Sequence, residues 1–194
     1  MRDRRFVAEH RGGPLNRQDH AVLARWAADC AERVLPLFRR CSTDPRPQRA
    51  LEVLRAWADG KLKTGVAMKA SLAAHAAARE AHDKAAIAAA RAAGQAVATA
   101  HAADHSMGAL LYALKALEAA GSPSQAELRS QLAKLPAHLR EPVAQGVNLR
   151  LRKLGIRRAG TAMKVLKRAA ESQRRLLGPR PAAGSDDIEC AEKK

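Results

Sequence analysis

The sequence predicts an all-α protein, an alanine-rich bundle of several helices with a basic helical arm and a disordered tail at its C-terminal end. Nearly half of residues 66–120 are alanine, which is the strongest helix former and is depleted in strands. Before this segment, apolar residues recur at three- and four-residue steps, as on one face of a helix. No alternating run of Val, Ile and Thr is long enough for a strand. β-Structure is therefore not expected.

Composition and turn residues divide the chain into four segments. We expect residues 1–16 to be a flexible basic arm, because they contain four arginines and a Gly-Gly-Pro turn. Residues 17–155 should form the bundle, and residues 156–178 a basic C-terminal helix. Residues 179–194 combine Pro, Gly and charge and should be disordered.

The first bundle helix should span residues 17–40, where Pro36 should kink it or end it early. Asp44 and Pro45 then supply an N-cap and a first-turn proline for a second helix. That helix should end near Gly60.

The alanine-rich segment should divide into two or three helices. Gly65, the polar stretch 79–84 and the step Ala93-Gly94 are the expected breaks. Small side chains on several faces allow helix axes to approach closely. This segment is therefore the expected buried centre of the bundle.

The net charge of +16 is concentrated near the C-terminus. Residues 148–180 contain eleven arginines and lysines, against Glu171 as their one carboxylate. Such a stripe can bind the phosphates of nucleic acid or of anionic lipid, can bind an acidic protein, or can be a solvated helix face. No base-reading motif accompanies the charge. The candidate residues for binding an anion or a partner are Arg150, Arg152, Lys153, Arg157, Arg158, Lys164, Lys167, Arg168, Arg174 and Arg175.

A second candidate site is a group of ionisable residues in the alanine-rich segment. If residues 97–111 form one helix, Asp104 lies on the stripe that faces the core. His101 and His105 flank it, and His75 on another helix is a suitable partner. Because a buried carboxylate is costly unless it is paired, we expect these residues to form a buried polar network. A ligand-binding or catalytic pocket is the alternative.

The motifs favour binding over catalysis. His101 and His105 have the spacing that lets two imidazoles reach one metal ion, but no third ligand and no catalytic glutamate accompany them. The sequence contains no nucleophile elbow, no phosphate-binding loop and no dinucleotide-binding loop. We therefore expect no metal, no cofactor and no enzymatic activity.

Apolar runs and cysteines indicate a cytoplasmic protein. The chain has no apolar run of about 18 residues and no apolar segment near its start, so we expect neither a membrane span nor a secretory signal. Its three cysteines have no CxxC spacing. We expect Cys30 and Cys41 to be small core hydrophobes.

The most distinctive runs are WAADCAERVLP at residues 26–36 and AVATAHAADH at residues 96–105. Together with shorter runs at residues 73–79 and 112–116, they resemble the Imm-5-like family of bacterial immunity proteins over about residues 19–155. Some relatives are described as exonuclease subunits, which this sequence does not support because it lacks the ATP-binding loop and the coiled-coil repeats. The resemblance implies a small helical protein that neutralises a toxin by occluding it.

Charge constrains the partner that the resemblance implies. A protein with a net charge of +16 is complementary to an acidic protein, whereas nuclease toxins are usually basic. An acidic toxin that is not a nuclease is therefore the favoured partner. The first alternative is a nucleic-acid-associated protein that binds phosphates through the C-terminal arm. The second is a small-molecule binder or enzyme built around Asp104, His101 and His75.

If the C-terminal arm contacts DNA, the affinity should fall steeply with salt, because each neutralised phosphate adds about 0.9 to the log-log salt slope. Six contacts should weaken binding by about a thousandfold between about 50 and 200 mM salt. Fluorescence anisotropy of labelled DNA measures this slope. Deleting residues 157–194 should abolish the binding and leave the bundle folded. If the intact chain does not retain DNA even at low salt, this alternative is wrong.

Overall fold

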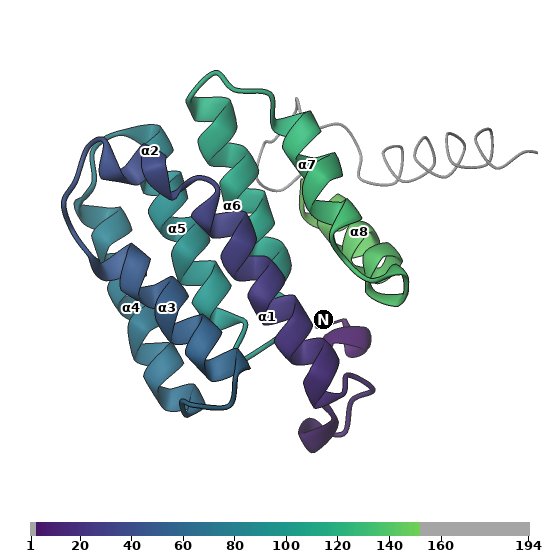
Figure 1. Ribbon diagram of the computed structural model, residues 1–194. Coiled ribbons are helices and arrows are strands. Elements are labelled where there is room, and N and C mark those ends of the chain that lie inside the picture. Colours follow the sequence, from purple (N-terminus) through teal and green to yellow (C-terminus); the bar gives the residue numbers. More distant parts are fainter. Residues whose placement is uncertain (1–2, 152–194) are drawn as a thin grey trace, which may run out of the picture.

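Eight α-helices make up most of the chain that the structure describes (Figure 1). The structure is a computed structural model and describes residues 3–151. Within that range there is no β-strand, which confirms the predicted all-α fold, and no helix combines the length and hydropathy that crossing a membrane requires. The helices are α1 (Arg17–Glu32), α2 (Leu35–Arg39), α3 (Arg46–Ala58), α4 (Thr64–Glu80), α5 (Lys84–Ala98), α6 (His105–Ala119), α7 (Ser124–Ala133) and α8 (Ala137–Leu151). The basic helix expected at residues 156–178 and the tail at residues 179–194 lie outside the described residues.

Capping side chains and proline set several helix boundaries. Asn16 and Asp83 cap α1 and α5, because their side-chain oxygens each accept a 2.8 Å hydrogen bond from a backbone N–H in the first turn. Pro36 lies in the first turn of α2, where its missing N–H removes no intrahelical bond. The first expected helix is therefore split into α1 and α2, in agreement with the break predicted at this proline.

α5 is the central helix of the bundle. It packs against α1, α2, α3, α4 and α6. In Figure 1, α1 and α3 lie across the near side, while α4 and α6 flank α5. α7 and α8 pack against α6 on the side away from α4.

The composition of α5 permits this arrangement. Eleven of its fifteen residues are buried, and nine of those eleven are alanine. Because an alanine side chain is a single methyl group, neighbouring helices approach the α5 backbone on several sides. The alanine-rich segment therefore forms the buried centre, as predicted.

A second core, rich in leucine, lies where α7 and α8 meet α1 and α6. Trp26, Met107, Leu114 and Leu128 are among its buried members. The indole Nε1 of Trp26 donates a 2.8 Å hydrogen bond to the backbone oxygen of Gln131. This bond connects α1 to α7 and satisfies the buried indole donor.

The N-terminal segment differs from the flexible arm that its charge predicted. Phe6 and Leu15 are buried in the leucine-rich core, with 3% and 5% of their surface exposed. The backbone of Leu15 bonds to that of Val7 and of Glu9, at 3.1 and 2.8 Å. Over residues 3–16, the expectation of a loose arm is therefore wrong. Burial of two large apolar side chains stabilises the segment, which the arginine content did not reveal.

The breaks predicted near Gly65 and at residues 79–84 agree with the bounds of α4 and α5, but the third break in the alanine-rich segment differs from its predicted place at Ala93-Gly94. α5 continues through Gly94, and the chain turns at residues 99–104 instead. Asp104 consequently precedes α6 and does not lie on the core-facing stripe of a continuous helix. The helix assumed for residues 97–111 is therefore wrong.

The two described cysteines have different environments. Cys30 is buried in the leucine-rich core, where burial raises the pKa of its thiol well above the ordinary value. Cys41 is exposed, two residues after α2 ends. The prediction of a core position is wrong for Cys41, because α2 ends before this residue reaches the bundle.

A larger side chain inside α5 should destabilise the bundle. We expect Ala92→Leu, at a fully buried position, to lower the free energy of unfolding by roughly 1–3 kcal/mol through overpacking. Ala119→Leu, at an exposed position of α6, should change it by less than about 0.5 kcal/mol. Urea unfolding measures both values. Equal stability of the two variants would show that α5 is not tightly packed.

Candidate functional site

A line of side chains follows the one side of α5 that no helix covers. The residues of α5 that are not buried are Lys84, Ile87, Arg91 and Gln95. They recur at three- and four-residue steps and so share one side of the helix, between α4 and α6. We call the outer surface of these three helices the α4–α6 face. Its other members are Leu72, His75 and Arg79 of α4 and His105, Tyr112 and Lys115 of α6.

His75 packs directly on the backbone of α5. A Cβ atom built on Gly94 would lie 2.6–2.8 Å from three atoms of the His75 ring, so only glycine accommodates the imidazole there. Burial lowers the pKa of His75, and the nearby charges of Arg91, Arg79 and His105 lower it further. His75 is therefore neutral near pH 7.

Gln95 connects α5 to α6 in a similar way. Its Oε1 atom lies 2.7 Å from Nδ1 of His105, which donates to it. A Cβ atom on Gly108 would lie 2.6 Å from the same oxygen, so Gln95 packs against the α6 backbone. The structure thus brings two of the predicted site residues, His75 and His105, to one face of the bundle.

Asp104 has a different partner from the one expected. Its Oδ2 atom lies 3.3 Å from the Arg150 guanidinium of α8, and the two side chains are 19% and 32% exposed. Its Oδ1 atom is buried without a hydrogen-bond partner among residues 3–151. His101 is half-buried, and its side chain takes part in none of the hydrogen bonds found within the same range. The expected Asp–His network is therefore corrected to an Asp104–Arg150 pair, because the turn at residues 99–104 directs the carboxylate towards α8.

The guanidinium of Arg150 is held by contacts within the protein. Besides Asp104, its guanidinium contacts the backbone oxygen of Gly146 at 3.1 Å and the Met107 sulfur at 3.3 Å. The other nine residues predicted to bind an anion or a partner lie outside the described range. Their role stays a prediction.

The α4–α6 face is basic and partly apolar. Arg79, Arg91 and Lys115 take part in none of the ion pairs found within residues 3–151, and no member of the face is a carboxylate. Leu72 is 67% exposed, and Tyr112 is half-buried. A surface with unpaired cations beside aromatic and aliphatic side chains suits contact with an acidic protein surface.

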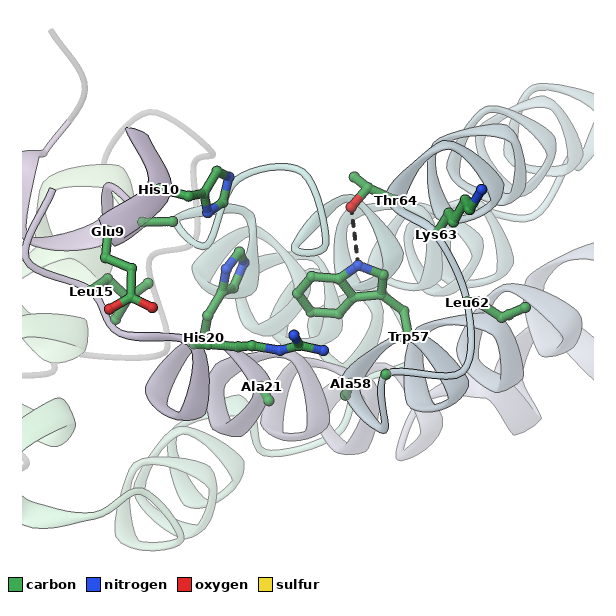
Figure 2. Close-up of a pocket in the computed structure, with 13 residues that line it drawn as sticks. Glu9, His10, Leu15, His20, Ala21, Trp57, Ala58, Leu62, Lys63 and Thr64 are labelled. Atoms are coloured by element: carbon green, nitrogen blue, oxygen red, sulfur yellow. Dashed lines mark hydrogen bonds between the residues drawn. The ribbon is translucent and has the colours of Figure 1, made fainter. Parts of the chain in front are cut away.

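A cleft of about 560 Å³ opens elsewhere on the molecule (Figure 2). Its walls come from the N-terminal segment, the start of α1 and the connection between α3 and α4. His10, Arg17, His20, Trp57 and Lys63 are its larger polar and aromatic residues. The sequence interpretation did not single out these residues, although an isolated histidine and tryptophan in an aromatic-poor chain were a usable signal.

His20 and Trp57 are held in place at the centre of this cleft. Nε2 of His20 donates a 2.6 Å hydrogen bond to the backbone oxygen of Thr99. The His20 ring meets the Trp57 ring edge to face, with centroids 5.0 Å apart. Burial lowers the pKa of His20 and outweighs the Thr99 bond, which raises it, so the imidazole is neutral near pH 7. Trp57 in turn donates a 3.1 Å hydrogen bond from Nε1 to Thr64 Oγ1.

Neither candidate site shows a metal centre. Throughout residues 3–151, no three or more His, Cys, Asp or Glu side chains gather closely enough to hold a metal ion. The structure therefore offers two surfaces for binding, the α4–α6 face and the cleft at Trp57.

The fold and these surfaces define the class of protein, a small all-α bundle that presents a basic face. The chain belongs to the family described as Imm-5 like putative immunity protein, whose model matches residues 13–138. The match runs from the turn before α1 into the start of α8 and includes every member of the α4–α6 face. No curated protein and no solved structure matches the chain.

The contact between His75 and Gly94 predicts a strong energetic coupling. We expect Gly94→Ala to lower the free energy of unfolding by roughly 1–3 kcal/mol, because the new methyl group overlaps the imidazole. In a His75→Ala background the same change should be neutral or stabilising, since alanine favours a helix over glycine by about 0.8–1 kcal/mol. Urea unfolding of the four proteins gives the coupling. If the effects of the two substitutions on stability are additive, the His75 ring does not contact Gly94.

Proposed function

We propose that this protein is an immunity protein that binds an acidic toxin and blocks it by occlusion. The observation that carries the proposal is the family match over residues 13–138, because the family is described by an immunity role. An all-α bundle with an exposed basic face fits a protein that acts by contact. Occlusion requires a surface and no catalytic machinery.

The α4–α6 face is the proposed contact surface. Among residues 3–151, eight of fourteen carboxylates form ion pairs with arginine or lysine, while fifteen of twenty-two arginines and lysines form none. The unpaired groups Arg79, Arg91 and Lys115 project from this face around Leu72 and Tyr112. Exposed cations steer an acidic partner, and the aromatic and aliphatic side chains supply the apolar contact that holds it.

The positive charge of the protein also limits which kind of toxin it can bind. Nuclease toxins are usually basic because they bind a polyanion, and two basic surfaces repel one another. The proposed partner is therefore acidic over its contact surface. Of the alternatives, a small-molecule or enzyme function stays a prediction, although the site expected around Asp104 gains no support, since the Asp104 carboxylate pairs with Arg150 of α8. Binding of nucleic acid by the C-terminal arm stays a prediction.

Charge reversal on the α4–α6 face tests this proposal. We expect the triple variant Arg79→Glu, Arg91→Glu, Lys115→Glu to bind the toxin encoded beside this protein's gene at least about tenfold more weakly, because each new carboxylate faces an acidic surface. Calorimetric titration measures the affinity. Growth of cells that produce the toxin together with each variant measures protection.

A matched control separates local contact from net charge. Arg49→Glu, Arg129→Glu, Lys134→Glu changes the net charge equally at exposed positions of α3 and α7. This variant should bind and protect like the unmodified protein. Equal loss in both triple variants would show a non-specific charge effect. Failure of the unmodified protein to bind or protect would reject the immunity role itself.

A further inference from the structure

We propose that the cleft at Trp57 is a binding site for a small organic anion, a carboxylate attached to a planar or apolar group. This inference goes beyond the immunity role, since no residue that lines the cleft belongs to the α4–α6 face. The volume of about 560 Å³ is in the range of small-molecule sites, which are concave, largely apolar and equipped with a few polar groups.

The walls of the cleft suit a planar or apolar group. Leu15, Ala21, Ala58 and Leu62 contribute aliphatic surface, and Trp57 contributes an aromatic ring. In Figure 2 the Trp57 ring lies between His20 and Thr64. Because its Nε1–H is already bonded to Thr64 Oγ1, the indole is fixed and offers its ring for stacking.

Two unpaired cations supply the attraction for a negative charge. Arg17 and Lys63 line the cleft, and within the described chain neither forms an ion pair. A Cβ atom on Gly60, whose φ is +78°, would lie 3.1 Å from a guanidinium nitrogen of Arg17. The guanidinium therefore rests against the α3–α4 connection at the cleft. Glu9 is the one carboxylate in the lining, so the cations outnumber it.

The start of α4 adds to this attraction. Lys63 is the N-cap residue of α4, and no side chain caps the free N–H groups of the first turn. Those N–H groups and the helix dipole favour an anion at this end of a seventeen-residue helix. Thr64 does not compete for them, because its hydroxyl accepts the Trp57 bond.

His20 is a neutral ring in the lining of the same cleft. Only 5% of its surface is exposed, and its Nε2–H is committed to the Thr99 backbone oxygen. Because a carbonyl oxygen only accepts, Nε2 carries the proton and Nδ1 carries the lone pair. The charge that attracts an anion therefore comes from Arg17 and Lys63, while the neutral His20 and Trp57 rings provide the planar surface beside them.

Nuclear magnetic resonance of the full chain tests the site with benzoate as the probe. The indole N–H signal of Trp57 should shift saturably, with a dissociation constant in the millimolar range, while the signal of Trp26 in the leucine-rich core stays fixed as an internal control. The Trp57→Phe variant assigns the two signals. Benzylamine, of similar shape but opposite charge, should cause no saturable shift, and inorganic phosphate should bind more weakly than benzoate.

Variants of the two cations complete the test. Arg17→Gln and Lys63→Gln should each weaken benzoate binding about tenfold. Lys69→Gln is the control, because Lys69 is an exposed cation of α4 that does not line the cleft. The proposal is overturned by the absence of a saturable Trp57 shift, by equal binding of benzylamine, or by unchanged affinity in both cation variants. No toxin enters this measurement, so its outcome is independent of the immunity role.

Discussion

The structure depends on the close approach of five helices to α5, which is possible because most of its buried side chains are single methyl groups. In a bundle built on leucine, large side chains set the distance between helix axes, whereas the methyl groups of α5 allow the axes to approach more closely. Many of the bulky residues lie in the leucine-rich core, while Leu35, Phe38, Leu51 and Leu54 of α2 and α3 belong to the core around α5. One helix therefore organises the alanine-rich part of the bundle, and the α4–α6 face follows from the packing around it.

This packing also determines the character of the α4–α6 face. Because α5 is covered on its other sides, its exposed residues form one narrow line between two helices. His75 packs against Gly94 of α5, and Gln95 packs against Gly108 of α6. A larger residue in place of either glycine would push the helices apart. The surface proposed to bind a toxin is thus rigid, since it is part of the helix packing and not of a loop.

Most carboxylates of the described chain are paired, whereas most of its arginines and lysines are not. Ion pairs with arginine or lysine hold eight of the fourteen carboxylates within residues 3–151, and several of these pairs, such as Asp104–Arg150 and Arg55–Asp29, join elements that are distant in sequence. The remaining arginines and lysines have no such partner within residues 3–151, and they include those of the α4–α6 face and of the cleft. The same excess of positive charge thus supports both proposals. The α4–α6 face would bind an acidic protein, and the cleft at Trp57 would bind a small organic anion.

The sequence by itself determined that the protein is helical, that an alanine-rich segment forms its centre, and that Pro36 and the polar stretch 79–84 divide it, because these properties depend on neighbours within a few residues. Tertiary structure alone decided that Gly94 receives the ring of His75, that Asp104 meets Arg150, and that the cleft forms at His20. These contacts join positions far apart along the chain, 46 residues for the ion pair and 79 for the bond between His20 and the Thr99 oxygen. Periodicity identifies the side of a helix that is buried, but the partner of each side chain depends on how the helices are oriented around α5.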